Sequence, residues 1–476
     1  MAQETGKGLR LVVIGAGPGG YAAAALAAAK GCDTTLVEAG ALGGTCLNTG
    51  CIPSKILRKS TGLFREVRES DTFGISTREP ELDMAGVQAR KKGIIAAQQK
   101  GVAGLMEKNG VKLIQGRAAL EGRDRVRVDR PGREGLTLEF DRLILATGSV
   151  PAQIPGFPFD GEHILSSDHV LDLETLPESV LIVGGGVIGC EFAFILNDAG
   201  VKVTVVEALE RVLDIPGFDG QGSKLIQRAM KKRKIKCLTS QRVTGAVLSD
   251  RGCRVRLEPT NGRAKSRAEI EAEKVIVVAG RQPATKGLGL ETAGVDMDGR
   301  GYVVVNEFME TSVKNIYAIG DMAGFPKPML AHVATAEARR AVSHALGSPG
   351  PMSYRAIPSA VFTSPEAAWV GMTAKEAEQA GISAQTHTLL FRTIGKVQVL
   401  GELDGEAAIT ADTQSGIILG VRLVGAHATE LISQACLAVE NKLTLDQLAN
   451  TIHAHPTVSE VMVELAWKAT GQALHA

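Results

Sequence analysis

Two glycine-rich turns, each placed between an apolar run and a helix-like segment, constrain the fold of this 476-residue chain most strongly. The first turn spans 15–20 after the apolar run 11–14, and the second spans 184–189 after the run 180–183. Short, uninterrupted apolar runs are typical of parallel strands that helices cover on both faces. We therefore expect two α/β halves, each built around a strand, a tight turn and a helix.

A glutamate follows each turn at the same distance, because Glu38 lies 23 positions after Gly15 and Glu207 lies 23 positions after Gly184 (15 to 38, 184 to 207). Such a carboxylate can bind a ribose hydroxyl pair, while the turn and the helix N-terminus bind a pyrophosphate. One such pattern is a weak signal, but its recurrence in context predicts two dinucleotide sites. The carboxylate of Glu207 would repel a ribose phosphate, which favours NAD over NADP in the second site. The glycines expected to shape the two sites are Gly15, Gly17, Gly20, Gly184, Gly186 and Gly189.

Two cysteines, Cys46 and Cys51, lie five positions apart in the segment 43–55, at the expected start of a helix. In a regular helix their Cα atoms would be about 8.6 Å apart, whereas a disulfide usually spans at most about 7 Å. A disulfide between them therefore requires a distorted first turn, which Gly50 and Pro53 permit. A strained bridge of this kind would be reduced easily, which is typical of a redox disulfide.

The cysteine spacing also allows a metal half-site or two unconnected buried thiols. The other five cysteines are scattered without ligand-like spacing, so no metal site is expected. An odd count of seven leaves at least one free thiol, which favours a reducing compartment and a cytoplasmic location. The nearly uncharged segment 11–29 superficially resembles a signal peptide, but its glycines are better explained by the first turn.

The net charge of +1 gives no general attraction to nucleic acid or to an anionic membrane. The basic run 231–234 is interpreted as a solvated helix end.

The length predicts about three domains. Segments 143–148 and 275–280 are similar strand ends, which indicates an internal duplication. A further strand end, 316–321, places Asp321 at its tip, where it could accept a hydrogen bond from a polyol or ribityl hydroxyl.

These elements, in this order, resemble the pyridine nucleotide-disulfide oxidoreductases over almost the whole chain. The resemblance also rests on further segments, which are 146–148, 280–281, 320–321, 362–366 and 453–460. It implies an α/β fold with two Rossmann-like dinucleotide-binding domains, for FAD and NAD, followed by a C-terminal α+β dimerisation domain. The implied boundaries are 1–150 for the FAD-binding domain, 151–280 for the NAD-binding domain, 281–350 for a central region that completes the FAD site, and 351–476 for the interface domain of a homodimer.

The resemblance assigns roles to the cysteines and to the last motif. Cys46 is expected to exchange with the thiol substrate and Cys51 to face the flavin. His455 is expected to reach the disulfide of the other subunit as an acid-base, with Glu460 orienting it. An imidazole suits this role because it accepts and returns a proton near neutral pH. A lone histidine is more often structural, and His453, to which the resemblance assigns no catalytic part, is interpreted as a residue that supports the site or packs beside it.

The resemblance also implies the cofactor contacts. Lys55 is expected near the flavin, paired with Glu191. The other residues expected at FAD are Gly15, Gly17, Gly20, Glu38, Thr45, Ala118, Thr147, Asp321 and Ala331. Those expected at NAD are Gly184, Gly186, Gly189, Glu207, Val243, Gly280 and Arg281.

The cysteine motif is most similar to that of family members that oxidise a dihydrolipoyl group with NAD+. This implies a separate lipoyl-carrying protein as partner, from a 2-oxoacid dehydrogenase or glycine cleavage system. Another disulfide reductase of the family is the first alternative, although a glutathione-type enzyme would carry a basic residue in place of Glu207. A mercuric reductase would add a C-terminal cysteine pair, whereas the last cysteine here is Cys436. The second alternative, a docking or NADH-sensing subunit, would not need the cysteine pair or the 453–460 motif.

Overall fold

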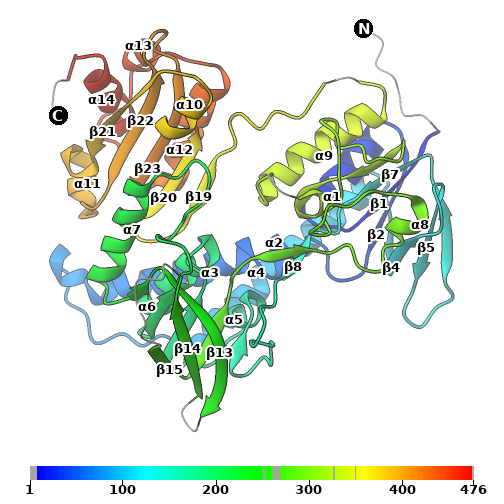
Figure 1. Ribbon diagram of the computed structural model, residues 1–476, viewed down its shortest axis with the longest axis horizontal. Helices are drawn as coiled ribbons and strands as arrows, with labels where there is room; N and C mark the ends of the chain where they lie inside the picture. Colours follow the sequence, from blue (N-terminus) through cyan, green and yellow to red (C-terminus); the bar gives the residue numbers. More distant parts are fainter. Residues whose placement is uncertain (1–7, 250–251, 261–267, 325–326, 349, 474–476) are drawn as a thin grey trace.

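The structure is a computed structural model that describes residues 8–249, 252–260, 268–324, 327–348 and 350–473 (Figure 1). Three units are visible, with the N-terminal and C-terminal units well separated in this view. Within the described ranges, no helix has the length and apolar character needed to cross a bilayer.

The first unit is built on a parallel five-stranded sheet in the order β18-β7-β1-β2-β3. Its strands are β1 (Arg10–Ile14), β2 (Asp33–Glu38), β3 (Lys112–Gln115), β7 (Arg142–Leu145) and β18 (Ile316–Ala318). Val12 and Val13 in the central strand point to opposite faces and are both buried, as expected for a strand covered on both faces. Strand β18 comes from the region 281–350, and it pairs with β7 of this sheet.

Small side chains bring the helices of the first unit close together. Helix α1 (Pro18–Ala29) packs against α9 (Ala331–Ala345), and its residues Ala23, Ala24 and Ala27 are completely buried. The unit also contains a small antiparallel sheet and a short helix. These elements are β4 (Arg117–Leu120), β5 (Arg125–Asp129), β6 (Leu136–Glu139) and α8 (Leu290–Ala293).

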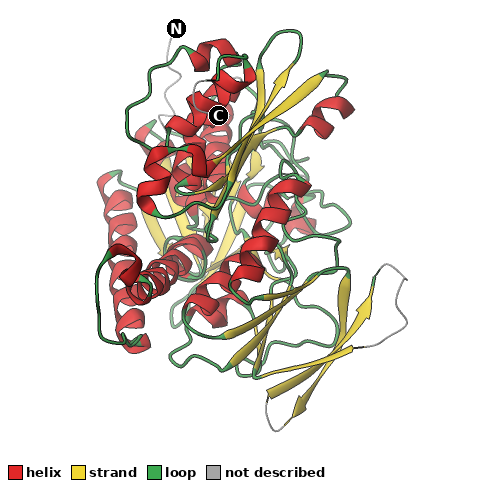
Figure 2. Cartoon of the chain, turned by 90° about the vertical axis from the view of Figure 1, so that its left-hand side faces the viewer, coloured by secondary structure: helices red, strands yellow, loops and turns green. Residues whose placement is uncertain are grey.

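The second unit repeats this plan with a parallel sheet in the order β12-β11-β10-β16-β9. Its strands are β9 (Ile164–Leu165), β10 (Ser179–Val183), β11 (Lys202–Val206), β12 (Lys236–Leu238) and β16 (Lys274–Val277), and its helices are α5 (Ser167–Leu171), α6 (Val187–Asp198) and α7 (Gly220–Lys232). A separate antiparallel sheet projects from it, as Figure 2 shows. That sheet consists of β13 (Gln241–Ser249), β14 (Gly252–Pro259) and β15 (Ala268–Ala272).

Two connections join the first and second units. Strands β8 (Ser149–Pro151) and β17 (Arg281–Pro283) pair antiparallel where the chain leaves and re-enters the first unit. Helix α3 (Cys51–Arg68) packs against α6, and Leu57 of α3 belongs to the hydrophobic core of the second unit. Two shorter elements and a long helix complete this region, namely α2 (Gly44–Asn48), η1 (Ser70–Phe73) and α4 (Met84–Lys108). The helix that begins at the second cysteine of the motif therefore bridges the two halves.

The third unit is an antiparallel sheet in the order β19-β20-β23-β22-β21, covered by helices. Its strands are β19 (Ser359–Val361), β20 (Glu366–Gly371), β21 (Ala384–Leu390), β22 (Glu406–Asp412) and β23 (Ile418–Gly425). Its helices are α10 (Ala374–Gln379), α11 (Gly395–Leu400), α12 (Ala428–Glu440), α13 (Leu445–Ala449) and α14 (Glu460–Ala469), and it contains the short 3-10 helix η3 (Phe391–Thr393). Another short 3-10 helix, η2 (Gly320–Ala323), lies in the first unit. The expected fold class, two Rossmann-like units followed by an α+β unit, is confirmed.

Candidate active site

The helix that carries the cysteine motif is interrupted between the two cysteines. Cys46 lies in α2, and Cys51 is the first residue of α3. The break falls at Thr49 and at Gly50, whose φ and ψ are −145° and −110°. A Cβ atom on Gly50 would lie 2.9 Å from the carbonyl oxygen of Thr45, so the close approach of the two helices requires glycine. The distortion expected of a first helical turn is thus a complete break between two helices.

The cysteines are thiols in this structure, so the predicted disulfide is not formed in it. The pKa values of the two thiols shift in opposite directions, and the largest cause is a hydrogen bond from Cys46 to Cys51. That hydrogen bond, together with the positive charge of Lys55, lowers the pKa of Cys51 to about 7 against the opposing effects of burial and of Glu191. The same bond, burial and the charge on Cys51 raise the pKa of Cys46. When the pair of thiols loses one proton, the negative charge therefore lies on Cys51.

Lys55 and Glu191 form the predicted pair across the two halves of the chain. The Lys55 Nζ donates to both carboxylate oxygens of Glu191, at 3.0 and 2.7 Å. Glu191 is buried in α6, and its Oε1 also accepts a hydrogen bond from the backbone N–H of Phe362 at 2.9 Å. The Lys55 Nζ lies 4.5 Å from the centre of the Phe362 ring. Phe362 lies in the segment 362–366, on which the resemblance partly rests, but the sequence predicts no role for it.

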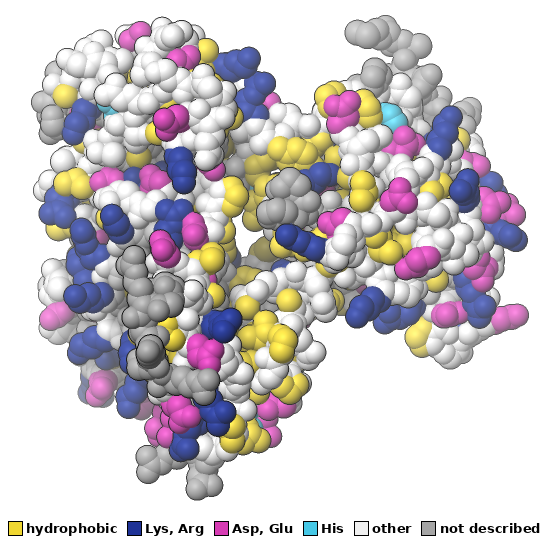
Figure 3. All heavy atoms as spheres, viewed as in Figure 1, with side chains coloured by type: hydrophobic (Ala, Val, Ile, Leu, Met, Phe, Trp, Pro, Cys, Tyr) yellow, Lys and Arg dark blue, Asp and Glu magenta, His cyan; other side chains and the backbone are white. Residues whose placement is uncertain are grey.

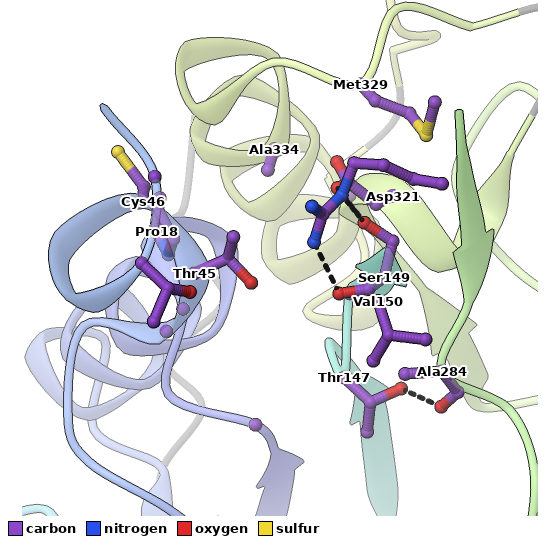
Figure 4. A pocket seen from close by; sticks show the side chains of 18 of the residues that line it. Pro18, Thr45, Cys46, Thr147, Ser149, Val150, Ala284, Asp321, Met329 and Ala334 are labelled. Atoms are coloured by element: carbon purple, nitrogen blue, oxygen red, sulfur yellow. Dashed lines mark hydrogen bonds and ion pairs between the residues drawn. The ribbon is translucent and has the colours of Figure 1, made fainter. Parts of the chain in front are cut away.

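A cavity of about 1170 Å³ connects the cysteines to both units. Figure 3 shows a hollow, lined largely by hydrophobic side chains, between the right-hand part of the molecule and the rest. The close-up in Figure 4 shows Thr45 and Cys46 on one side of the pocket and Ser149 and Asp321 on the other. Expected FAD residues that line it are Gly15, Gly17, Glu38, Thr45, Lys55, Ala118, Thr147, Asp321 and Ala331.

Each glycine-rich turn, with its flanking strand and helix and the glutamate that follows, is called a fingerprint below. The glycines of the first fingerprint allow close packing of the helix and leave space for a ligand. Gly20 does not line the cavity, but a Cβ atom on it would lie 1.8 Å from the carbonyl oxygen of Gly15, so it allows α1 to pack on the strand. Gly17 and Gly44 do line the cavity, and a Cβ atom on Gly44 would lie 2.6 Å from the Cα of Gly17. This wall of bare backbone is suited to close approach by a pyrophosphate.

The glutamate of each fingerprint is held by backbone amides. Glu38 accepts hydrogen bonds from the amides of Ala16 and Gly40, both at 2.6 Å. Glu207 accepts them from Gly185 at 2.5 Å and Leu209 at 2.8 Å. In the second fingerprint, a Cβ atom on Gly189 would lie 1.9 Å from the oxygen of Gly184, as for the first. The remaining residues expected at NAD, apart from Arg281, do not line the cavity; they are Gly184, Gly186, Gly189, Glu207, Val243 and Gly280.

Arg281 lies apart from the other residues expected at NAD. Its Nε donates to Ser149 Oγ at 2.7 Å, and its Nη2 donates to the Ser149 carbonyl oxygen at 2.8 Å. The Ser149 Oγ in turn donates to Asp321 Oδ2 at 2.5 Å, and Arg281 Nε lies 4.0 Å from the same carboxylate oxygen. The β8–β17 pairing places its guanidinium beside expected FAD residues, and its contact with NAD stays a prediction. Ser149 was missed, since nothing in its local sequence distinguishes it.

The predicted histidine and acid lie together at the start of α14. His455 Nδ1 is 2.8 Å from Glu460 Oε1, and the other carboxylate oxygen accepts from the backbone N–H of Thr457 at 2.9 Å. The His455 side chain is 78% exposed, so it is available to a second molecule. His455 is not among the described residues that line the cavity. His453 contacts Gln434 and the carbonyl oxygen of Thr451, in keeping with a packing role.

Comparison with known proteins identifies the family. Residues 9–338 match the pyridine nucleotide-disulphide oxidoreductase family, and residues 357–466 match its dimerisation domain. The chain belongs to the pyridine nucleotide-disulphide oxidoreductases. As a member of this family, the chain is an oxidoreductase that takes FAD and NAD as cofactors.

Relatives within the family cover nearly the whole chain. The dihydrolipoyl dehydrogenase of Haloferax volcanii is 40% identical over 470 residues, 98% of both chains. That of Bacillus subtilis is 39% identical over 474 residues, with the same coverage. The crystal structure of LpdA from Mycobacterium tuberculosis has a TM-score of 0.88 at 30% identity, covering 97% of this chain and 99% of the other. The HOCl-induced flavoprotein disulfide reductase RclA from Escherichia coli, at a TM-score of 0.83 and 25% identity, has the same fold.

The cavity fits the flavin cofactor of this family. It joins the bare backbone of the first fingerprint, the carboxylates of Glu38 and Asp321, and the Cys51 end of the redox motif. These groups suit, respectively, a pyrophosphate, the hydroxyls of a ribose and a ribityl chain, and a ring system beside a thiol. Within the described ranges, no group of three or more His, Cys, Asp and Glu side chains is arranged to hold a metal ion.

Proposed function

We propose that this chain oxidises the dihydrolipoyl group of a carrier protein and reduces NAD+ to NADH. The supporting observation is the juxtaposition of Cys46 and Cys51 beside Lys55 and Glu191, in a cavity that reaches the first fingerprint. Relatives named dihydrolipoyl dehydrogenase, at about 40% identity over nearly the full length, support the same substrate.

The proposed reaction begins with the cysteine pair as a disulfide. A substrate thiolate attacks Cys46 Sγ, the bond between the cysteines breaks, and Cys51 leaves as a thiolate. The partner subunit's His455 accepts the proton of the second substrate thiol, and Glu460 holds its imidazole by the contact at Nδ1. The second substrate thiolate then attacks the substrate sulfur bound to Cys46. The substrate disulfide closes, and Cys46 leaves and takes the proton from the imidazolium.

The charge left on Cys51 is stabilised by the surroundings described above. The thiol of Cys46 donates a hydrogen bond to it, and the ammonium of Lys55 favours its ionised form. When bound, FAD supplies the two-electron relay that returns the dithiol to a disulfide and passes hydride to NAD+. We propose that Glu38, Asp321 and the backbone near Ala118 and Ala331 hold FAD, and that Glu207 and the second fingerprint hold NAD.

The active enzyme is proposed to be a homodimer, because His455 is exposed and outside the cavity of its own chain. The match to the family's dimerisation domain over residues 357–466 supports this. The proposed partner is a lipoyl-carrying protein of a 2-oxoacid dehydrogenase or glycine cleavage system, and the proposed location is the cytoplasm.

The decisive experiment compares two reactions of the purified flavin-loaded protein. Reduction of NAD+ by free dihydrolipoamide is expected to be rapid, and reduction of glutathione disulfide by NADPH is expected to be negligible. Absence of the first reaction in a flavin-loaded dimer would mean that the cysteine pair serves another thiol substrate.

A further inference from the structure

The backbone of Phe362 is bound from both sides by helices of the other two units. Its N–H donates to Glu191 Oε1 of α6 at 2.9 Å, and its carbonyl oxygen accepts from Arg58 Nε of α3 at 3.1 Å. Phe362 directly follows β19 of the C-terminal unit. One residue of this unit therefore touches both helices that carry the Lys55–Glu191 pair.

A second ion pair joins the same two helices. Arg58 lies three residues after Lys55, and its Nη1 donates to Asp198 Oδ2 at 2.8 Å. Asp198 lies seven residues after Glu191 on α6, and its side chain is only 1% exposed. Residues seven apart on a helix lie on one face about two turns apart, so the two pairs hold α3 against α6 side by side. Arg58 is thus fixed at one end by Asp198 and at the other by Phe362.

The contacts of Phe362 and Arg58 hold the Lys55–Glu191 pair, which lies beside the Cys51 thiol. The charged groups that influence the pKa of Cys51 are Lys55, which lowers it, and Glu191, which raises it, while the Cys46 thiol lowers it by a hydrogen bond. The Lys55 side chain is 31% exposed, so solvent competes for its ammonium, whereas Glu191 is 8% exposed and anchored by the Phe362 N–H. Loss of that anchor would release the carboxylate that keeps the ammonium near Cys51.

We propose that Arg58 and the backbone of Phe362 are positioning residues through which the C-terminal unit holds Glu191 and Lys55 against Cys51. The inference rests on the proposed redox role of Cys51 but not on the identity of the thiol substrate. The C-terminal unit would then both form the dimer interface and influence the ionisation of the cysteine pair in its own chain.

The test uses two arginines of α3 that both face Asp198. Arg58→Met removes the contacts to the Phe362 carbonyl oxygen and to Asp198, whereas Arg65→Met removes a guanidinium whose Nε lies 3.6 Å from Asp198 Oδ1 and which does not contact Phe362 in this structure. Each flavin-loaded dimer is reduced by two electrons with dithionite, and the long-wavelength absorbance of the Cys51 thiolate against the flavin is titrated with pH. A neighbouring cation shifts such a pKa by one or more units, so Arg58→Met is expected to raise the midpoint by about half a pH unit or more. Arg65→Met is expected to leave it unchanged.

The outcomes separate this inference from the proposed function. An unchanged or lowered midpoint in Arg58→Met, or an equal rise in Arg65→Met, would overturn it. If Arg58→Met does not bind flavin, Arg58→Lys replaces it, because one ammonium cannot reach both Asp198 and Phe362. A smaller upward shift is then expected, and no shift would overturn the inference. Dithionite needs no thiol substrate, so an inactive enzyme with the expected titration would refute only the dihydrolipoyl substrate.

Discussion

Glu38 and Glu207 hold equivalent loops by the same pair of contacts. In each half, one carboxylate oxygen accepts from the amide 22 residues earlier, in Ala16 or Gly185, and the other accepts from an amide two residues later. A carboxylate can accept about four hydrogen bonds, so each side chain keeps capacity for the hydroxyls of a ribose. The duplication of the two halves therefore extends to individual hydrogen bonds.

Replacing Glu207 is predicted to change the preferred nucleotide. Glu207→Arg removes a charge that repels a ribose phosphate and adds one that attracts it. The ratio of kcat/KM for NADPH over NADH is expected to rise at least about tenfold, equivalent to about 1.4 kcal/mol. Steady-state kinetics with both nucleotides measure it, and Glu207→Gln controls for loss of the loop contacts alone. An unchanged ratio in the arginine variant would contradict the ribose assignment.

The two cysteines are predicted to differ in their spectroscopic effects. Cys51→Ser should abolish the long-wavelength absorbance of the two-electron-reduced enzyme, because the thiolate beside the flavin is lost. Cys46→Ser should retain it, since the thiolate of Cys51 remains. Anaerobic titration with dithionite provides the measurement, and identical spectra from the two variants would show that the roles are assigned wrongly.

The absorbance of the unmodified reduced enzyme is predicted to depend on pH near neutrality. The pKa of Cys51 is lowered to about 7, so its thiolate is present above that pH and is protonated below it. The absorbance should therefore fall as the pH is lowered through about 7, with the other thiol still protonated because the pKa of Cys46 is raised. Persistence of the full signal well below this range would show a stronger stabilisation of the thiolate than these contacts provide.

His455 and Glu460 are predicted to act on the thiol substrate only. General acid-base catalysis contributes roughly 10²- to 10⁴-fold, so His455→Gln should lower the rate of dihydrolipoamide oxidation by roughly that factor. Glu460→Gln should have a smaller effect, because the imidazole remains. Reduction of ferricyanide by NADH, which needs no thiol exchange, serves as the control reaction. An equal loss in both reactions would indicate a structural defect instead.

Asp198 is predicted to contribute strongly to stability. The run 231–234 was interpreted as a solvated helix end, but the Arg233 side chain is only 15% exposed, and its guanidinium contacts buried Asp198. Asp198→Asn leaves buried guanidinium groups without a counter-charge, which should cost about 3 kcal/mol or more. Asp404→Asn removes the exposed partner of neighbouring Lys232 and should cost at most about 1 kcal/mol. Urea denaturation of the two variants compares them, and equal losses would contradict the burial argument.

Local patterns in the sequence were sufficient for the two fingerprint units. Apolar runs, glycine spacing and a terminal acid act over fewer than about thirty residues, and their geometry is set by backbone sterics. The third glycine of each fingerprint, Gly20 or Gly189, lies where no Cβ atom would fit. The need for a distorted segment between Cys46 and Cys51 also followed from helix geometry alone, although its form, a break into two helices, did not.

The site as a whole was decided by the tertiary structure. The pairing of Lys55 with Glu191 was expected only from resemblance, because the two residues are 136 positions apart. The position of Arg281 beside Ser149 and the contact of Arg58 with Phe362 had no local signal. Such contacts depend on how three separately formed units pack, and that packing is determined by the summed burial of their surfaces. The sequence by itself determined the nucleotide-binding units and the reactive pair, and only their packing determined which charges surround the thiols.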